Sequence, residues 1–153
     1  SKLGFNFEPS EIGSVFGLQQ LKKLNKNIKT RIKNFNAHKK FFSNFPELFD
    51  LPYQDPKTFT GWLAYPVMIK TNRIRRKDLM IFLEKNQIQT RVVFTGNILR
   101  QPGFKNIKCI KKRSYPNADK IMSNDFLIGC HHGMTNNDVK YIHSKIFEFI
   151  KKI

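Results

Sequence analysis

The sequence predicts an α+β fold in which helices lie on one face of a small, mostly antiparallel sheet and a long N-terminal helix projects from it. Three observations lead to this prediction. The chain has 153 residues, enough for one domain with a single core. Hydrophobic residues make up 40% of it and include 15 Phe, which is typical of a folded chain. Segments with helical periodicity alternate with short runs that are typical of strands.

The N-terminal region predicts one long amphipathic helix. Ser10 is a favourable N-cap, and apolar residues from Ile12 to Phe42 then recur mostly three or four positions apart. At roughly 1.5 Å per residue, such a helix would be about 50 Å long. A compact domain of this size cannot cover that length by itself. We therefore expect part of the helix to contact something outside the domain.

Shorter elements follow the long helix. Prolines within residues 46–56 break the helical pattern. Residues 62–69 predict a strand, and its internal Pro66 is typical of an edge strand or a bulge. The next predicted elements are a helix over residues 76–86 and a strand over residues 88–94.

The C-terminal third predicts a loop followed by two helices and a strand. Residues 96–112 have no clear period and are predicted as a long loop. A short helix over 116–123 and a last strand over 126–130 come next. Residues 135–138 form a variant of the capping box that starts a C-terminal helix, whose inward positions are Val139, Ile142, Ile146 and Phe149.

Composition excludes several classes of protein. No apolar run approaches the roughly 18–20 residues needed to cross a bilayer, and the N-terminus lacks the order of a signal peptide. We therefore expect a cytoplasmic protein without a membrane partner. Cys109 and Cys130 cannot form a disulfide framework and have no spacing typical of zinc ligands, so no metal site is expected.

The chain is strongly basic, with 28 Lys and Arg against 11 Asp and Glu and a formal net charge of +17. Eight basic residues and no acidic one lie between Glu11 and Glu47, and the same count recurs between Glu84 and Asp119. Such charge favours a polyanionic partner, such as nucleic acid, an anionic membrane or a phosphorylated ligand. A bias of the whole sequence toward Lys, Asn, Ile and Phe would explain the same charge without any ligand.

The sequence contains no self-contained catalytic set. GxGxxG, GxxxxGK[ST], HExxH and GxSxG motifs are absent and the acids are scattered, so we assign no catalytic residue. His131 and His132 follow Cys130, but adjacent side chains on a strand or turn point apart and no third ligand has a useful spacing. We interpret them as loop residues that line an interface or the edge of a substrate. His38 and His143 lie in predicted helices and are expected at the surface or its boundary.

The stretch over residues 91–102 carries more specific chemistry. It leaves a strand, turns at Gly96-Asn97, and presents two guanidinium groups and an Asn and a Gln amide. Arg is suited to bidentate phosphate recognition, and Asn and Gln can both donate to and accept from sugar hydroxyls. Alternatively, Arg91 is an ordinary exposed strand residue and Asn97 adopts a left-handed turn conformation. The residues alone leave both interpretations open.

Several motifs occur in order along nearly the whole chain and resemble one family. Gly4-Phe5-Asn6-Phe7 and residues 12–21 resemble the GYN and GLAQL segments of the DegT/DnrJ/EryC1/StrS sugar aminotransferases. Residues 94–102, 117–122, 126–129 and 133–135 resemble the branch of that family typified by CDP-4-dehydro-6-deoxyglucose 3-dehydratase. Phe5 replaces the usual Tyr, Glu8 stands where a basic residue is common, and Cys130-His131-His132 replaces a V/I-Y-P-like turn.

The resemblance implies a fold and an organisation. It implies the C-terminal small domain of the aspartate-aminotransferase fold, which is fold type I of the pyridoxal phosphate enzymes. Residues 1–44 would be an interdomain segment and long linking helix, and residues 45–153 the small α+β domain. Pyridoxal or pyridoxamine 5'-phosphate would bind mostly in an N-terminal cofactor domain that this sequence lacks, with its lysine or, in the dehydratase branch, its histidine. The implied partners are that domain, a second subunit of a homodimer and a nucleotide-diphosphate sugar, and this chain alone is expected to be inactive.

The resemblance also implies roles for single residues. Asn6 matches the GYN asparagine, which would reach the cofactor phosphate of the neighbouring subunit. Residues 96–102 match the GNxxRQP segment near the substrate side of the small domain, and Lys120 could meet the substrate's phosphates. The candidate substrate-binding residues are Asn97, Arg100, Gln101, Lys120 and His131.

The predicted function is that of the C-terminal domain of a nucleotide-sugar 3-dehydratase, which removes the 3-hydroxyl of a 4-keto-6-deoxyhexose in lipopolysaccharide sugar biosynthesis. One alternative is a domain of a 4-aminotransferase that acts on the same substrate class. Another is a stand-alone basic module that binds nucleic acid, although the sequence lacks RNP-like aromatics and a recognition-helix motif. A third is a truncated pseudoenzyme that serves as a dimerisation piece.

Overall fold

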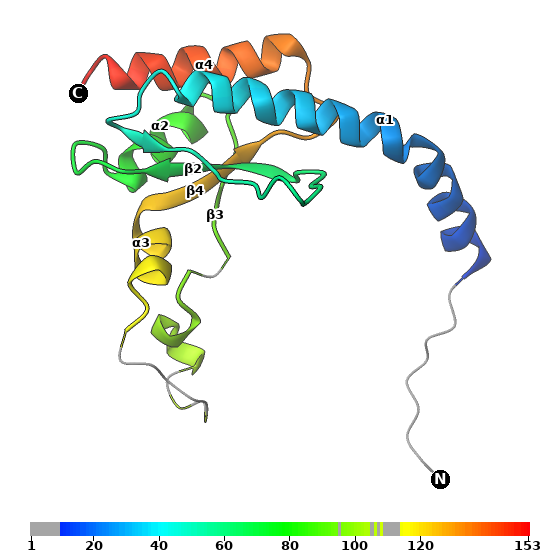
Figure 1. Cartoon of the computed structure of the whole chain (residues 1–153), viewed down its shortest axis with the longest axis horizontal. Helices are drawn as coiled ribbons and strands as arrows, with labels where there is room; N and C mark the ends of the chain where they lie inside the picture. The colour runs from blue at the N-terminus through cyan, green and yellow to red at the C-terminus, as the bar shows by residue number, and fades with distance from the viewer. Residues whose placement is uncertain (1–9, 95, 105, 107, 109–113) are drawn as a thin grey trace.

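The computed structural model describes residues 10–94, 96–104, 106, 108 and 114–153. Figure 1 shows the helices and strands along the chain. Their order is α1 (Glu11–Phe42), β1 (Phe49–Asp50), β2 (Ala64–Ile69), α2 (Arg76–Lys85), β3 (Thr90–Val92), α3 (Pro116–Asn124), β4 (Asp125–Gly129) and α4 (Asn136–Ile150). Two short 3₁₀ turns, Ile98–Arg100 and Pro102–Phe104, interrupt the predicted loop. The predicted helices and strands are present in order, and the two-residue strand β1 was not predicted.

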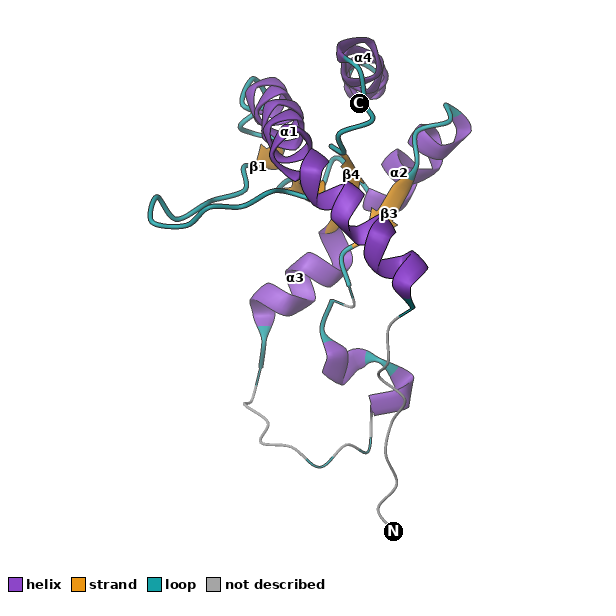
Figure 2. Ribbon diagram, turned by 90° about the vertical axis from the view of Figure 1, so that its right-hand side faces the viewer, coloured by secondary structure: helices purple, strands orange, loops and turns teal. Residues whose placement is uncertain are grey.

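The four strands form one sheet in the order β1-β2-β4-β3, and each neighbouring pair is antiparallel. Helices α1, α2 and α4 lie on one face of the sheet, whereas α3 lies on the other side (Figure 2). There, Ile121 of α3 lines a small cavity with Met68 and Asp125. The predicted α+β class is thus confirmed, and three of the four α-helices share one face.

Pro66 does not lie in an edge strand, because β2 is the second strand of the sheet. Strand β1 pairs only with Met68 and Ile69, whereas β4 pairs with β2 from Ala64 to Met68. At Pro66 the side of β2 away from β4 therefore has no strand beside it. A residue without an N–H is tolerated at such a position. Strand β2 is thus not an edge strand of the sheet, but the part of β2 that contains Pro66 pairs with a described strand on one side only.

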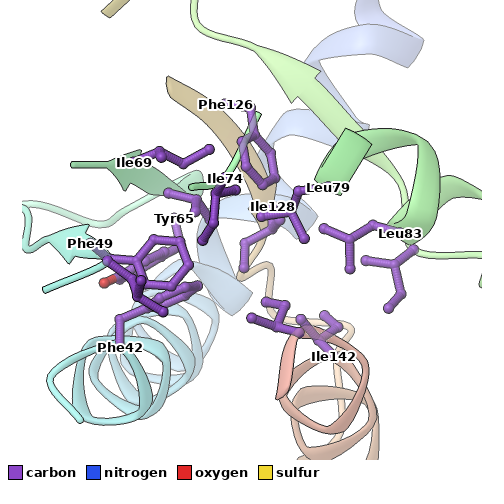
Figure 3. Packing of buried hydrophobic residues seen from close by; sticks show 14 of the residues in the cluster. Phe42, Phe49, Tyr65, Ile69, Ile74, Leu79, Leu83, Phe126, Ile128 and Ile142 are labelled. Carbon is purple, nitrogen blue, oxygen red and sulfur yellow. The ribbon is translucent and has the colours of Figure 1, made fainter. Parts of the chain in front are cut away.

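The core lies between the sheet and its three helices. Tyr65, Val67 and Ile69 alternate with less buried residues along β2, as expected for a strand with one buried face. The ring of Phe42 from α1 stacks on Tyr65, with centroids 5.2 Å apart. The core residues from the helices and β4 are labelled in part in Figure 3 and include Phe35, Phe42, Leu79, Leu83, Phe126, Ile128, Ile142 and Ile146.

Helix α1 has two parts with different environments. Its C-terminal part packs into the core, and its N-terminal part projects beyond the sheet (Figure 1). Ser10 caps the projecting end by accepting a hydrogen bond from the Gly13 N–H at 3.1 Å. None of the described residues covers the apolar side chains of that part, which are Ile12, Val15, Phe16, Leu18, Leu21 and Leu24. No described helix is both long and apolar enough to span a membrane.

Buried polar side chains join α1 to the end of β4. Asn34 Nδ2 donates to the carbonyl oxygen of His131 at 3.0 Å. His38 Nε2 lies 3.0 Å from the carbonyl oxygen of Gly129, and His38 Nδ1 lies 3.0 Å from His143 Nε2. The prediction that His38 lies at the surface or its boundary is therefore wrong, because its imidazole is fully buried and satisfies a carbonyl group where the strand ends. His143 is half-buried and lies at the boundary, as predicted.

The hydrogen bonds fix the tautomer of each ring. A carbonyl oxygen can only accept, so His38 Nε2 carries the proton and its Nδ1 accepts one from His143 Nε2. Both rings are neutral in this arrangement. Burial lowers the pKa of His38 to about 4, and it also lowers the pKa of His143 to about 4.

We expect these two histidines to make the fold sensitive to acid. In the unfolded chain each ring takes up a proton as the pH falls below 6.5, whereas the folded rings stay neutral down to about pH 4. The free energy of unfolding should therefore fall as the pH drops from about 6.5 to about 4, by roughly 3 kcal/mol from His38 and by less from the half-exposed His143. Urea unfolding at a series of pH values measures this slope.

Two variants test the assignment. His143→Phe keeps a ring against Phe41, which stacks on His143 at 4.2 Å, and removes one titrating group. Its stability should depend less steeply on pH than that of the parent protein. His132→Asn, in the exposed loop, should leave the slope unchanged. Equal slopes for the parent and His143→Phe would contradict the neutral buried pair.

Candidate functional site

The loop after β3 is held close to α3. Gly96 has a φ of 65°, and a Cβ at this position would overlap the Met122 side chain of α3. Glycine is therefore required both by the left-handed backbone and by the close approach. Asn97 has an extended backbone with a φ of −85°, so the alternative that Asn97 itself takes the left-handed conformation is wrong.

Asn97 and Arg100 share one partner, Asp119. The amide of Asn97 caps the first 3₁₀ turn by accepting from the Leu99 N–H at 3.1 Å, and it donates to Asp119 Oδ1 at 2.8 Å. Arg100 Nε donates to Asp119 Oδ1 and an Arg100 Nη donates to Asp119 Oδ2, both at 3.1 Å. These bonds, first from Arg100 and then from Asn97, hold the pKa of the Asp119 carboxyl below its ordinary value.

Asp119 was not among the candidate residues predicted from the sequence. It lies in the first turn of α3, where an acidic residue is common because it is favourable next to the helix N-terminus, so its position alone did not indicate a contact with Arg100. The signal available in the sequence was its place in the motif over residues 117–122. A bidentate partner for Arg100 became visible only when the fold brought residues 100 and 119 together.

The other candidate residues, Gln101, Lys120 and Asn6, are not among those described above as bonded to Asp119. Gln101 follows Arg100 directly, and its N–H donates to the carbonyl oxygen of Ile98 at 3.1 Å. Lys120 points the other way along α3 and pairs with Asp50 of β1, with Nζ and Oδ2 3.1 Å apart. Burial raises the pKa of the neighbouring Asp125 carboxyl to about 6, while Lys120 acts in the opposite direction. Asn6 lies outside the described residues.

His131 does not join the group around Arg100. It follows β4, whereas α3 precedes that strand, and the five residues of β4 separate the two by about 16 Å. His131 instead lines a cavity of about 480 Å³ together with Arg91, Asp138 and Tyr141. Its Nδ1 accepts a hydrogen bond from the Gly133 N–H at 3.2 Å. The structure thus brings together Asn97, Arg100 and Gln101, and separately His131 and Arg91.

The Arg100 group presents an oriented cation at the surface. The Arg100 side chain is 62% exposed, so its guanidinium can meet a second anion while Asp119 fixes its orientation. Burial raises the pKa of Cys130 to about 11, so this thiol is a poor nucleophile. Within the described part of the chain, no three His, Cys, Asp or Glu residues could hold a metal ion together.

The comparisons with known proteins agree with the fold. The model of the DegT/DnrJ/EryC1/StrS aminotransferase family matches residues 1–147, which confirms the resemblance predicted from the sequence. The chain is 33% identical over 150 residues to lipopolysaccharide biosynthesis protein RfbH of Salmonella typhimurium strain LT2, covering 97% of this chain and 34% of that protein. It is 30% identical over 144 residues to the GDP-4-keto-6-deoxy-D-mannose 3-dehydratase of Escherichia coli O55:H7, covering 91% of this chain and 36% of the relative.

The solved structures give the same result. The structure of E. coli GDP-4-keto-6-deoxy-D-mannose-3-dehydratase with bound hydrated PLP superposes with a TM-score of 0.81 at 26% identity, covering 93% of this chain and 36% of the other. The prediction of an aspartate-aminotransferase-type small domain is thus confirmed at the level of the fold. The chain spans about a third of the length of the curated relatives it matches.

We expect Asp119→Ala to release the loop and leave the domain folded. Asn97 and Arg100 would lose their common partner, so the Leu99 amide should exchange its hydrogen faster by on the order of tenfold. The melting temperature should change little, because exposed ion pairs contribute little to stability. Hydrogen exchange resolved by residue measures the first effect, and thermal unfolding the second.

Asp78→Ala is the matched control for this variant. It removes another Arg–Asp pair, in which Arg75 Nε lies 2.6 Å from Asp78 Oδ2 on α2. Exchange at Leu99 should remain unchanged in this control. Equal exchange at Leu99 in the parent and in Asp119→Ala would mean that Asp119 does not hold the loop.

Proposed function

The chain belongs to the DegT/DnrJ/EryC1/StrS aminotransferase family, and we propose that it is the C-terminal part of a pyridoxal- or pyridoxamine-phosphate-dependent nucleotide-sugar 3-dehydratase. The substrate class is a nucleotide-linked 4-keto-6-deoxyhexose used in lipopolysaccharide O-antigen sugar biosynthesis. The observation that carries this proposal is the match to a 3-dehydratase in both sequence and structure over more than nine-tenths of the chain.

The contacts around Arg100 support a role in substrate binding. The guanidinium is oriented by Asp119 and remains more than half exposed, an arrangement suited to the pyrophosphate of a nucleotide sugar. Gln101 follows Arg100 and could bind sugar hydroxyls. In this proposal Lys120 adds positive charge on the same helix as Asp119, and His131 lies at a more distant edge of the substrate.

The described residues do not fit a cofactor pocket by themselves. No described lysine is buried, so none is suited to bind pyridoxal phosphate covalently, as the 4-aminotransferase alternative requires. Among the described histidines only His38 is fully buried, and both of its ring nitrogens are already hydrogen-bonded, so it does not fit the role of the histidine of the dehydratase branch. The cofactor would therefore be held by the N-terminal domain and the second subunit, with Asn6 reaching its phosphate. We propose that residues 45–153 position and enclose the substrate and that residues 1–44 connect them to that cofactor domain.

The size of the native protein is the first test. An antibody raised against this chain should detect a species far larger than 18.0 kDa in native extract, because the relatives are about three times as long. A band at 18.0 kDa would argue against an attached cofactor domain. It would favour a stand-alone nucleic-acid-binding module or a pseudoenzyme, and retention on a polynucleotide column that is lost with salt would identify the former.

The reaction product tests the activity. With the cofactor and a nucleotide-linked 4-keto-6-deoxyhexose, the intact protein should yield a sugar that lacks its 3-hydroxyl, identified by mass spectrometry. A product with an amino group at C4 would instead identify a 4-aminotransferase. Each outcome is read from the mass and fragmentation of the same product.

Arg100→Ala tests the substrate contact within the intact protein. Because a phosphate contact is made equally in the ground and transition states, we expect KM for the nucleotide sugar to rise by about tenfold and kcat to change less than about twofold. Arg75→Ala, which removes another exposed arginine paired with an aspartate, should leave both constants unchanged. A loss of kcat without a change of KM would contradict the proposed role of Arg100.

A further inference from the structure

A groove of about 710 Å³ lies between α2 and β3. Its apolar lining includes Met80 and Ile81 from α2 and Val92 from β3. Ile81 is 43% exposed and Val92 is 53% exposed, so both side chains are open to a partner. The groove shares no residue with the Arg100 group described above.

One wall of the groove is the free edge of the sheet. Strand β3 is the last strand in the order β1-β2-β4-β3, and among the described strands only β4 pairs with it. The Thr90 N–H donates to Glu84 Oε1 at 2.5 Å and so points away from β4. Along an antiparallel strand, the backbone N–H and C=O groups of successive residues point alternately toward and away from the neighbouring strand. The N–H and C=O of Val92, two residues after Thr90, therefore also point away from β4. Glu84 satisfies the edge at Thr90, whereas no described residue is hydrogen-bonded to the outward N–H and C=O of Val92.

The groove carries positive charge that the described residues neutralise only in part. Lys77, Lys85 and Arg91 line it, and no described carboxylate lies within 4.0 Å of the nitrogen atoms of these three side chains. The one acidic residue among the lining residues is Glu84. Hydrogen bonds from the N–H and hydroxyl of Thr90, and the charge of Arg91, lower the pKa of its carboxyl, so Glu84 stays ionised and offsets one of the positive charges. The groove therefore favours an anionic partner.

Charge also decides against self-association through this edge. Two copies paired through β3 would bring Lys77, Lys85 and Arg91 of one copy near those of the other, in molecules that each carry a net charge of +17. An apolar groove beside free backbone groups is, by contrast, suited to an extended peptide with acidic side chains.

We propose that the free edge of β3 binds an extended acidic segment of another protein as an added strand. Side chains alternate between the two faces of a strand. On the face of Val92 and α2, the added strand would carry apolar residues against Ile81. On the face of Arg91 it would carry acidic residues, and further acidic residues at its ends would meet Lys77 and Lys85.

A synthetic peptide tests the proposal on the full chain. The probe is a labelled peptide of roughly nine residues in which Val and Asp alternate, and binding is followed by fluorescence anisotropy. We expect saturable binding that weakens with salt, together with at least about tenfold slower hydrogen exchange at the Val92 amide of the unmodified protein. A peptide in which Lys replaces Asp should not bind. Binding without protection of Val92, or no binding, would overturn the proposal.

Charge-reversal variants locate the site. Lys77→Glu combined with Lys85→Glu should weaken peptide binding by about tenfold or more. The matched control, Lys33→Glu combined with Lys40→Glu, makes the same change of net charge on exposed lysines of α1 and should change binding less than about twofold. Equal weakening in both variants would mean that the peptide senses net charge alone and would overturn the proposal.

Val92→Pro removes the free donor and keeps the apolar character of the edge. Proline is tolerated on an edge strand where the N–H faces away from the sheet, so the melting temperature should stay near that of the parent. Peptide affinity should fall by about fivefold or more. If a single-stranded oligonucleotide protects the same groove and displaces the peptide, the site recognises nucleic acid and the proposal is wrong.

Discussion

The strand β4 ends beside helix α1, and two side chains of that helix are hydrogen-bonded to carbonyl groups there. Asn34 binds the carbonyl of His131, and His38 binds that of Gly129. Strand β4 pairs with both β2 and β3, so its position sets the position of the whole sheet. The His131 carbonyl also accepts from the Met134 N–H at 3.2 Å. A buried carbonyl without a donor is costly, and a helix in any other register would lose the bond from His38 to the Gly129 carbonyl. The aromatic packing of Phe35 and Phe42 is consistent with that register and does not define it alone.

At the other end of β4, two neighbouring residues of helix α3 contact the loop after β3 and strand β1. Asp119 fixes Asn97 and Arg100 in the loop after β3, and Lys120 pairs with Asp50 of β1. The two contacts point in different directions from one turn of helix. The orientation of the loop after β3 is therefore tied to β1 at the far edge of the sheet. The Gly96 backbone allows this loop to approach α3 closely enough for the contact with Asp119.

The sequence predicted the elements better than the contacts between them. Periodicity identified α1, α2 and α4, because an apolar stripe and a cap are local properties, but β1 has only two residues and leaves no pattern. Pro66 was assigned to an edge because a local rule cannot give the length of the neighbouring strand. His38 was placed at the surface because its two partners are 91 and 105 residues away. Arg100 and Asn97 were predicted as substrate-binding residues from their chemistry together with the family resemblance, and that role stays a prediction. The contact of both residues with Asp119 exists only in the folded chain.

The uncovered apolar side chains at the projecting end of α1 have a consequence for the life of the protein in the cell. A helix end that shows Val15, Phe16 and Leu21 to water resembles the exposed segments by which chaperones and proteases recognise unfinished proteins. While this helix end stays uncovered, the folded domain exposes an apolar surface of the kind that unfolded proteins expose. In the proposed enzyme the cofactor domain is joined to this helix in one chain, so docking of the two domains would cover these side chains and remove that signal.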